Sequence, residues 1–414
     1  MTAAPVNDPA VITSGHRATF ADLREDTYGL RRQVTPGGTT GLQSTSAAIV
    51  GAALEALNGW AGEVHLLPPD VATDQLDEPV ALLNPDPSGT TDPIVTSPED
   101  PSGIPTSWVI YTSGTTGMPK AIRHTLDSLT RTVVRSERSA GFTWGLLYDP
   151  NRMAGLQVLL QALRSNASIV APPVEARLSL RVQELISEHV TALSATPTLW
   201  RQILQLPKLH DWPLQQITLG GEIADQQVLN ALRTRFPEAR IVHVFASTET
   251  GAAFSVHDGQ AGFPVEFLSS PPRGVALEVR DGILHVHSPG VSAAASDGFA
   301  STGDIVEIEG DRVLFRGRSS GVVNIGGANV WPEQVETELR SHEDVLEVTV
   351  TAKPNPLAGN MLIATVVPTP TADREGLGKR VRKWARQELP GTHVPAMVKV
   401  VDELTIAATG KKSR

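Results

Sequence analysis

The stretch "YTSGTTGMPK", residues 111–120, places glycine, serine and threonine residues ahead of a single lysine. Small residues let backbone N–H groups approach an anion, and hydroxyl groups add hydrogen-bond donors, so the composition predicts a phosphate-binding loop. The pattern of a P-loop NTPase is not met, because Gly114 and Gly117 are only three residues apart and Lys120 follows Met-Pro. Composition alone leaves open whose phosphate the loop binds.

The residues around this loop predict a strand before it and a helix after it. The segment "SWVIYTSG" starts at residue 107 and is typical of a buried strand, and residues 121–139 have the pattern of a helix. A strand, a glycine-rich loop and a helix form the context that a phosphate loop needs.

The whole chain has the composition of an ordinary globular protein. Its 414 residues, 40% of them hydrophobic, predict a sizeable core and more than one domain. A net charge of -10 argues against nucleic acid as a bulk partner. The absence of cysteine excludes disulfides, thiolate metal sites and a cysteine nucleophile, so any thioester must use an external thiol. Neither a signal sequence nor a membrane span is apparent, which predicts no membrane partner and a cytoplasmic location.

The first three quarters of the chain predict layered α/β structure. Residues 45–60 are helix-like and residues 63–69 strand-like, and residues 67–107, rich in Pro, Asp, Ser and Thr, are loop or linker. Further strands are expected at residues 168–173 and 215–222, and a helix at residues 178–190 with Ser179 as N-cap. Alternating strands and helices indicate α/β layers.

The pattern changes after residue 275. Hairpins are predicted around Asp281-Gly282 and Gly310-Asp311, which gives a small β-subdomain. An α+β set follows, with helices at residues 332–342 and 374–390 and strands at residues 346–352 and 361–368. We therefore expect a large N-terminal domain over residues 1–318 and a small C-terminal domain over residues 319–414.

Five segments resemble, in the same order, the motifs of the adenylate-forming (AMP-forming) acyl/aryl-acid ligase superfamily, which includes acyl-CoA synthetases, peptide-synthetase adenylation domains and luciferase. They are residues 111–120, "HVFASTETG" at 243–251, "STGD" at 301–304, "GRSSGVVNIGGANVWPEQVE" at 317–336 and "TGKKSR" at 409–414. The resemblance covers nearly all of the chain and implies a mobile C-terminal domain. The part before the phosphate loop is short, so the chain resembles a shortened member.

The resemblance implies a site for ATP and Mg²⁺. The residues implied to wrap the β- and γ-phosphates are Thr112, Ser113, Gly114, Thr115, Thr116 and Gly117, with Lys120 adding a mobile positive charge. Glu249 is implied to hold Mg²⁺ and Thr248 to contact the α-phosphate. Asp304 is implied to accept hydrogen bonds from the ribose hydroxyls, and Arg318 to reach the ribose or the phosphates.

The adenine side of the site rests on two further segments. The turn of Gly220, Gly221 and Glu222 either lines the adenine and acyl pockets or is only structural. The segment that resembles the adenine-binding motif contributes His243, Phe245, Ala246 and Ser247. Phe245 replaces the usual tyrosine and either stacks on adenine or belongs to the core, and His243 replaces an asparagine that commonly recognises adenine.

The implied reaction has two steps. A carboxylate attacks the α-phosphate of ATP while Lys411 bridges the two groups. Pyrophosphate is released, and an acyl-adenylate is formed. The C-terminal domain then rotates about a hinge near residues 319–321, and Gly326 and Gly327 leave room for a pantetheine arm whose thiol displaces AMP. Lys412 is expected to be a solvated charge.

The sequence indicates the type of reaction more clearly than it identifies the acyl acceptor or the carboxylic acid. Coenzyme A is the leading acceptor, because residues 322–336 look closer to the CoA-ligase version of that segment and no carrier domain is expected after residue 414. The alternatives are the phosphopantetheine of a separate carrier protein, an amine, a non-catalytic nucleotide-binding homologue and a generic ATPase. The small carboxylic acid is not identified, and a monomer and a homodimer both remain open.

Two positions depart from the family pattern. Ser320-Gly321 replaces the acidic pair that is usual at the hinge. Arg152 occupies the place of a histidine or another aromatic residue, so it is either a surface residue or borders the acyl pocket and favours a polar or anionic acid.

Overall fold

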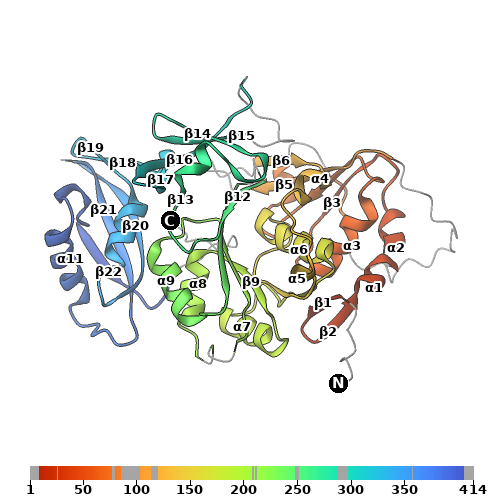
Figure 1. Ribbon diagram of the computed structural model, residues 1–414, viewed down its shortest axis with the longest axis horizontal. Coiled ribbons are helices and arrows are strands. Elements are labelled where there is room, and N and C mark those ends of the chain that lie inside the picture. Colours follow the sequence, from red (N-terminus) through yellow and green to blue (C-terminus); the bar gives the residue numbers. More distant parts are fainter. Residues whose placement is uncertain are drawn as a thin grey trace. The chain divides into compact units, whose positions relative to one another are not determined.

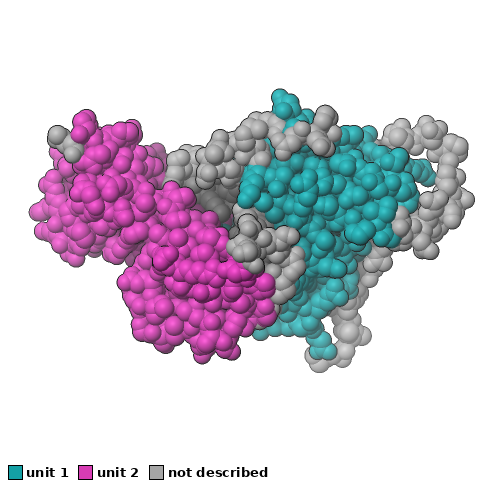
Figure 2. All heavy atoms as spheres, turned by 90° about the horizontal axis from the view of Figure 1, so that it is seen from above, with its two compact units in different colours: residues 1–195, 203–221, 232–257 teal, residues 196–202, 222–231, 258–414 magenta. Residues whose placement is uncertain are grey.

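The computed structural model describes residues 9–25, 27–76, 80–84, 103–112, 120–207, 209, 212–247, 251–287, 297–356 and 358–404. The chain divides into two compact units, which are distinguished by colour in Figure 2. Unit 1 comprises Met1–Ala195, Ile203–Gly221 and Leu232–His257. Unit 2 comprises Thr196–Gln202, Glu222–Ala231 and Asp258–Arg414.

Unit 1 contains an eight-stranded sheet with the order β12-β11-β10-β9-β7-β8-β1-β2, of which β12, β9, β1 and β2 are labelled in Figure 1. The strands from β11 to β1 in this order run parallel, and the two outer strands β12 and β2 pair antiparallel. In chain order the strands are β1 (Ala10–Thr13), β2 (His16–Thr19), β7 (Thr143–Leu146), β8 (Ser168–Val170), β9 (Ala192–Ala195), β10 (Gln216–Gly220), β11 (Arg240–Ser247) and β12 (Gly251–Val256).

Amphipathic helices pack on the strands of this unit. α6 (Met153–Ser165) buries Leu156, Leu159 and Leu160 and ends at Asn166, whose φ of 56° is the left-handed conformation typical of a helix C-terminus. α3 (Ala47–Leu57) begins at Ser46, whose hydroxyl accepts the Ile49 N–H, and it lies inside the predicted 45–60 helix. The other helices of the first 260 residues are α1 (Phe20–Glu25), α2 (Thr27–Arg31), α4 (Leu126–Thr130), α5 (Glu137–Ala140), α7 (Leu178–Ser187), α8 (Pro197–Leu204) and α9 (Gln226–Arg235).

The single helix predicted over residues 121–139 is wrong at its start and in its continuity: residues 120–124 form a strand, and two short helices, α4 and α5, lie in the rest of the range. Unit 1 also has a four-stranded sheet of β3 (Thr39–Leu42), β4 (Glu63–Leu66), β5 (Ser107–Thr112) and β6 (Lys120–His124), in that order. β6 pairs antiparallel with β5, from Thr112 opposite Lys120 to Trp108 opposite His124, and so satisfies the backbone groups of that edge of β5. Helix formation starts only after Thr125, which forms a capping box with Ser128.

The prediction of Ser179 as an N-cap is also wrong. α7 starts at Leu178, and the N–H of Arg181 donates to the carbonyl of Arg177 at 3.1 Å, so Ser179 lies inside the first turn. Arg177 occupies the N-cap position without a side-chain hydrogen bond to the helix. The helix itself is confirmed.

Unit 2 contains the small β-subdomain. Its five-stranded antiparallel sheet has the order β13 (Phe263–Pro264), β17 (Arg312–Arg318), β16 (Ala300–Glu309), β15 (Ile283–His287) and β14 (Ala276–Arg280). Both predicted hairpins are confirmed. Asp281 and Gly282 have φ of 51° and 73°, and Gly310 has φ of 59°, which are the positive values that tight hairpin turns require.

The last part of unit 2 is an α+β segment with its own core. It consists of the hairpin β18 (Val323–Ile325) and β19 (Ala328–Val330), α10 (Pro332–Leu339), α11 (Leu377–Glu388) and the sheet β20 (Val345–Asn355), β21 (Gly359–Pro368) and β22 (Met397–Val400). α11 lies along this sheet in Figure 1. A continuous cluster of buried apolar side chains includes Val335, Leu339, Val348 and Val381.

Short 3-10 helices complete the described structure: η1 (Thr73–Gln75), η3 (Val265–Leu268), η4 (Pro272–Gly274), η5 (Ser319–Gly321) and η6 (Gly391–His393). Within the described ranges no helix combines the length and apolar character needed to cross a bilayer.

Candidate active site

The carboxyl ends of the parallel strands define the edge of the large sheet where a ligand is expected. In open α/β sheets, ligands bind outside this edge because the strands deliver several loops to the same place. β10 ends at Gly220 and β11 at Ser247, and these two strands are direct neighbours in the sheet. The sheet therefore delivers the predicted glycine turn and the end of the predicted adenine segment to one edge.

The turn after β10 has the geometry that its glycines predict. Gly221 has a φ of 80°, which is a left-handed conformation that favours glycine. Glu222, the next residue, accepts the N–H of Thr198 through Oε2 at 3.0 Å. Thr198 lies in the first turn of α8, where a carboxylate is favourable near the helix N-terminus. Glu222 thus has a structural contact, and its contact with nucleotide stays a prediction.

The predicted adenine-binding residues lie on β11. Phe245 stacks on Phe254 of β12, with ring centroids 5.2 Å apart and an angle of 13° between the planes. His243 lies opposite Val256 in the same strand pair and is half-buried. The cross-strand partner therefore packs against one face of Phe245, and stacking of this ring on adenine stays a prediction.

The two residues predicted at the ribose form an ion pair. Asp304 on β16 lies opposite Arg318 on β17, and Arg318 Nε is 2.9 Å from Asp304 Oδ1. Asp304 is only 7% exposed, whereas half of the Arg318 side chain remains in solvent. The N–H of Asp304 donates to the hydroxyl of Thr302 at 3.0 Å, which fixes the backbone of the "STGD" segment.

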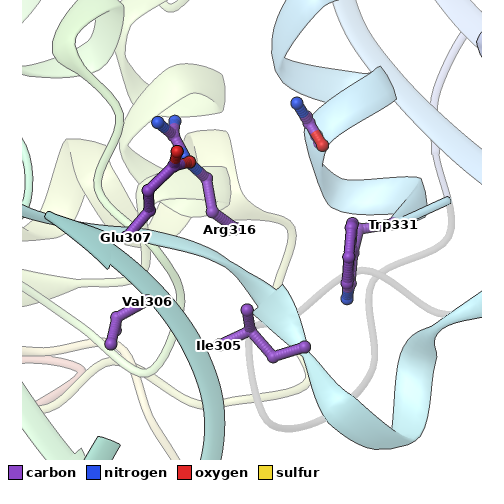
Figure 3. A pocket seen from close by; sticks show the side chains of 6 residues that line it. Ile305, Val306, Glu307, Arg316 and Trp331 are labelled. Atoms are coloured by element: carbon purple, nitrogen blue, oxygen red, sulfur yellow. The ribbon is translucent and has the colours of Figure 1, made fainter. Parts of the chain in front are cut away.

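A pocket of about 330 Å³ lies within unit 2, and its lining includes Ile305, the residue that follows Asp304 in the chain (Figure 3). The indole ring of Trp331 forms one wall, and Ile305, Val306 and the pair of Glu307 and Arg316 form the opposite side. Glu307 Oε2 lies 2.9 Å from Arg316 Nε. The position of Trp331 also explains why residue 317 is glycine, because a Cβ at that position would lie 3.0 Å from Trp331 Cδ1.

The ends of the phosphate loop are set by strand pairing. Thr112 and Lys120 lie opposite each other at the end of the β5–β6 pair, and the Lys120 side chain is exposed. A polar chain that sequence reasoning missed lies on the same sheet. The hydroxyl of Tyr111 is 2.6 Å from His65 Nδ1, and His65 Nε2 is 2.8 Å from Glu63 Oε1.

This polar chain continues to β6. Arg123 Nε donates to Glu63 Oε2 at 2.8 Å, and this hydrogen bond, against the opposing effect of burial, lowers the pKa of Glu63. Side-chain contacts therefore link strands β4, β5 and β6, and they include Tyr111, the first residue of the loop motif. Only the alternation of polar residues in "EVHL" and "KAIRH" could have signalled this contact.

The glycines predicted to receive pantetheine form the turn between β18 and β19. Gly326 and Gly327 have φ of 58° and 87°, and a Cβ at either position would meet no atom within 4 Å. Their positive φ values explain why glycine is needed in this turn. Binding of a pantetheine arm in the space beside the turn stays a prediction.

Several predicted site residues lie outside the described residues: Ser113, Gly114, Thr115, Thr116, Gly117, Thr248, Glu249 and Lys411. Within the part of the chain that the structure describes, no group of three or more His, Cys, Asp or Glu side chains is arranged to hold a metal ion, and Glu249 is not in that part.

The alternative of Arg152 as a surface residue is wrong. Arg152 is buried between β7 and α6, and its guanidinium pairs with Asp70. Asn151 is fully buried beside it and donates both its backbone N–H and its amide to Asp149 Oδ1, at 2.9 and 3.1 Å. Burial raises the pKa of the Asp149 carboxyl, and the hydrogen bonds from Asn151 oppose this shift. Contact of this buried polar segment with the acid stays a prediction.

Known proteins of the same architecture are numerous. The 2-succinylbenzoate–CoA ligase of Listeria monocytogenes serotype 4b (strain F2365) is 26% identical over 333 residues, which cover 74% of this chain and 68% of that protein. The anthranilate CoA ligase AuaEII in complex with anthranoyl-AMP superposes with a TM-score of 0.79 at 18% identity, covering 99% of this chain and 93% of that one.

A second solved structure extends the comparison. The o-succinylbenzoate coenzyme A synthetase of Bacillus subtilis, in complex with ATP and magnesium ion, gives a TM-score of 0.70 at 19% identity, over 99% of this chain and 96% of that one. These superpositions confirm the predicted α/β fold with its C-terminal segment.

Two family models match the sequence. The model of the AMP-binding enzyme matches residues 44–291, and the model of the AMP-binding enzyme C-terminal domain matches residues 334–411. The first match alone spans more than half of the chain and includes the phosphate-loop motif and the segment at 243–251. The resemblance noted from five short motifs is thereby confirmed, and the chain belongs to the AMP-binding enzyme family.

Proposed function

We propose that this protein is an AMP-forming acid:CoA ligase that activates a small carboxylic acid with ATP and transfers the acyl group to coenzyme A. The observation that carries the proposal is the ion pair of Asp304 and Arg318 on neighbouring strands. A buried carboxylate accepts hydrogen bonds from two vicinal hydroxyls well, and an arginine with an exposed edge reaches a neighbouring phosphate. The similar CoA ligases named above support the same chemistry.

The triphosphate is held, in this proposal, by the loop between β5 and β6. Pairing of Thr112 with Lys120 fixes both ends of the loop, and the polar chain below Tyr111 holds its first residue in place. Lys120 is exposed, and in this proposal its ammonium follows the leaving pyrophosphate. Serine and threonine hydroxyls and backbone N–H groups of residues 113–117 complete the phosphate contacts.

Magnesium fits the donor chemistry of the segment that follows β11. β11 ends at Ser247 on the carboxyl edge of the sheet, and the next residues, Thr248 and Glu249, offer only oxygen donors, which Mg²⁺ prefers. Glu249 is the residue that we propose to hold the ion. The bound ion would offset negative charge on the phosphates.

The chain's own groups then act in two stages. Lys411 places its ammonium between the acid and the α-phosphate, where it stabilises the charge of the transition state. Residues 319–414 form the proposed mobile domain, with η5 at residues 319–321 as its hinge. The thiol of the second stage comes from outside the chain, which has no cysteine, and we propose coenzyme A as its source.

Pyrophosphate exchange over a panel of aryl, short aliphatic and amino acids tests this function. We expect acid-dependent exchange, AMP as the nucleotide product and an acyl-CoA product. Lys411→Ala should reduce adenylation at least about a hundredfold, whereas Lys412→Ala should change it less than threefold. ADP as the product would indicate an ATPase. No exchange with any acid, together with no effect of Lys411→Ala, would indicate a non-catalytic homologue.

The acceptor is tested separately. Coenzyme A, a phosphopantetheinylated carrier protein and simple amines are offered to the enzyme with ATP and the preferred acid. We expect coenzyme A to be consumed fastest, and faster use of the carrier protein or an amine would replace this part of the proposal.

Location in the cytoplasm fits all of these substrates. Mass measurement in solution distinguishes a monomer from a homodimer.

A further inference from the structure

Four largely buried charged side chains in unit 2 form a closed ring of alternating sign, which we call the charge ring: Arg201, Asp225, Arg340 and Glu347. Arg201 pairs with Asp225, and Arg340 Nη2 lies 3.1 Å from the same oxygen, Asp225 Oδ2. Arg340 Nη1 lies 3.3 Å from Glu347 Oε1, and Glu347 Oε2 lies 3.6 Å from Arg201 Nη1, which closes the ring. The exposed fractions of the four side chains are 11%, 9%, 8% and 7%.

Burial makes the charge ring sensitive to the loss of any member. Charges out of water need partners, and removal of one partner leaves an uncompensated charge, whereas a matched pair that returns to water is hydrated. Burial, followed by the charge of Arg340, lowers the pKa of Arg201.

Further contacts fix two of the ring members in their secondary structure. Glu347 Oε1 also accepts the N–H of Val348 at 2.9 Å, and the hydroxyl of Thr337 lies 3.0 Å from Arg340 Nη2. Glu336 adds a third carboxylate near Arg340, at 4.0 Å. The ring is thus tied to α10 and β20 by more than charge.

One half of the ring is built on the turn that is proposed to line the nucleotide site. Asp225 Oδ1 accepts the N–H of Val228 at 3.0 Å and so caps α9, only three residues after Glu222. Glu222 in turn caps α8, the helix that carries Arg201. The other half lies at the end of α10, where Arg340 is the C-cap, and on β20, which contributes Glu347.

The ring separates into two matched pairs along the proposed domain boundary. Arg201 and Asp225 precede residue 318, and Arg340 and Glu347 follow it. Each half therefore keeps one arginine and one carboxylate when the halves part, so opening leaves no unpaired charge. This division suits a contact that forms and breaks in every cycle, because opening does not leave a buried charge without its partner.

We propose that Arg340 is a positioning residue, and that the charge ring holds residues 319–414 against the Glu222–Asp225 turn in one of the two half-reactions and opens for the other. This inference rests on the proposed function. The ring acts on the balance between two arrangements, so its loss should favour one half-reaction at the expense of the other.

The test measures both half-reactions in Arg340→Met, in the full-length chain. Adenylation is followed by acid-dependent pyrophosphate exchange, and thioester formation by release of AMP from synthetic acyl-adenylate on addition of coenzyme A. We expect the ratio of the two rates to change about tenfold or more, with the rates moving in opposite directions. Arg340→Lys should recover much of the wild-type ratio. Arg374→Met, which removes an exposed arginine paired with Asp402 in the same segment, should leave the ratio unchanged.

A parallel fall of both rates would assign Arg340 a purely structural role and overturn the proposal, as would an unchanged ratio. Hydrogen exchange provides a readout that does not depend on activity. In Arg340→Met we expect faster exchange at Val228 and over residues 340–350, and unchanged protection there would also overturn the proposal. If the wild-type chain shows no acid-dependent exchange, the proposed function fails, and hydrogen exchange still decides whether the ring holds the segment.

Discussion

At the scale of single residues, Asp304 is the predicted site residue with the best-defined surroundings. It is buried, paired with Arg318 and held by the hydroxyl of Thr302. Hydrogen bonds to a charged group are worth about 1.5–3 kcal/mol, so Asp304→Ala should raise the KM for ATP by about 10- to 100-fold. Steady-state kinetics with ATP varied and the acid saturating checks this.

A carboxylate elsewhere on the same strand supplies the control for that variant. Glu309 is an exposed residue of β16 that pairs with Arg316, so Glu309→Gln should leave the KM for ATP within about twofold of wild type. Equal effects of the two substitutions would mean that disturbance of the strand, and not loss of a ribose contact, raises the KM.

Asp149 gives a prediction for stability against pH. Its folded-state pKa is raised above 3.8 by burial, so between the unfolded and folded pKa values the folded state binds more protons than the unfolded state. The free energy of unfolding therefore falls as pH rises through this window. Asp149→Asn keeps an oxygen that accepts both hydrogen bonds from Asn151 and removes the buried charge.

We expect Asp149→Asn to raise the melting temperature by about 1–3 °C at pH 7, with the difference shrinking toward pH 4. Thermal melts at a series of pH values check this, and Asp311→Asn, at an exposed hairpin turn, serves as the control. A gain that does not depend on pH would show that the charge of Asp149 is not its cause.

At the scale of elements, two helical glycines make opposite predictions. In α3, a Cβ at Gly51 would meet Leu23 and Leu163 side chains at 3.5 and 3.6 Å, which is ordinary contact. In α6, a Cβ at Gly155 would lie 2.1 Å from the carbonyl oxygen of Asp149, which is backbone. Gly51→Ala should stabilise the protein by about 0.5–1 kcal/mol, and Gly155→Ala should destabilise it by about 2 kcal/mol or more.

Chemical denaturation of the two variants measures both effects, and each variant controls for the other because the substitution is the same. If both are stabilising, the loop between β7 and α6 can move away from Gly155 at little cost. In that case the buried segment around Asn151 and Arg152 is softer than its packing indicates.

The elements also show what the sequence could and could not predict. Hairpins at Asp281-Gly282 and Gly310 were predictable because their turns need residues that accept positive φ. β6 was not, because residues 120–124 become a strand only by pairing with β5, and this pairing overrides the local helical pattern of residues 121–139. Burial of Arg152 was likewise hidden, since Asp70 lies 82 residues before it.

The residues of the candidate site likewise fall into those that the sequence could predict and those that it could not. Asp304 and Arg318 were predictable because each lies in a segment that resembles a family motif, residues 301–304 and 317–336, and strand pairing places the two residues opposite each other. The charge ring was not, because Asp225 and Arg340 are 115 residues apart and each appears in the sequence as an ordinary surface charge. Motifs identify groups that touch a ligand, whereas contacts between distant helices leave no short pattern.

At the scale of the whole molecule, residues 319–414 should fold without the rest of the chain. Their apolar core is internal: Ile325 and Val330 from the hairpin, helix residues such as Leu339 and Val381, and strand residues such as Val348 form one cluster. A core of this kind in a segment of about 100 residues is typical of an independent domain. Arg340 and Glu347 remain paired with each other and become hydrated in the fragment, so their exposure costs little.

We expect the isolated fragment to give the circular dichroism of a folded α+β domain and a cooperative melt with an unfolding free energy of about 5 kcal/mol. Val348→Asp, which buries a charge in this core, should abolish the transition. A fragment that melts without cooperativity would show that this segment depends on the helices that carry Arg201 and Asp225. It could not then rotate as a rigid body between two half-reactions, because opening the charge ring would unfold it.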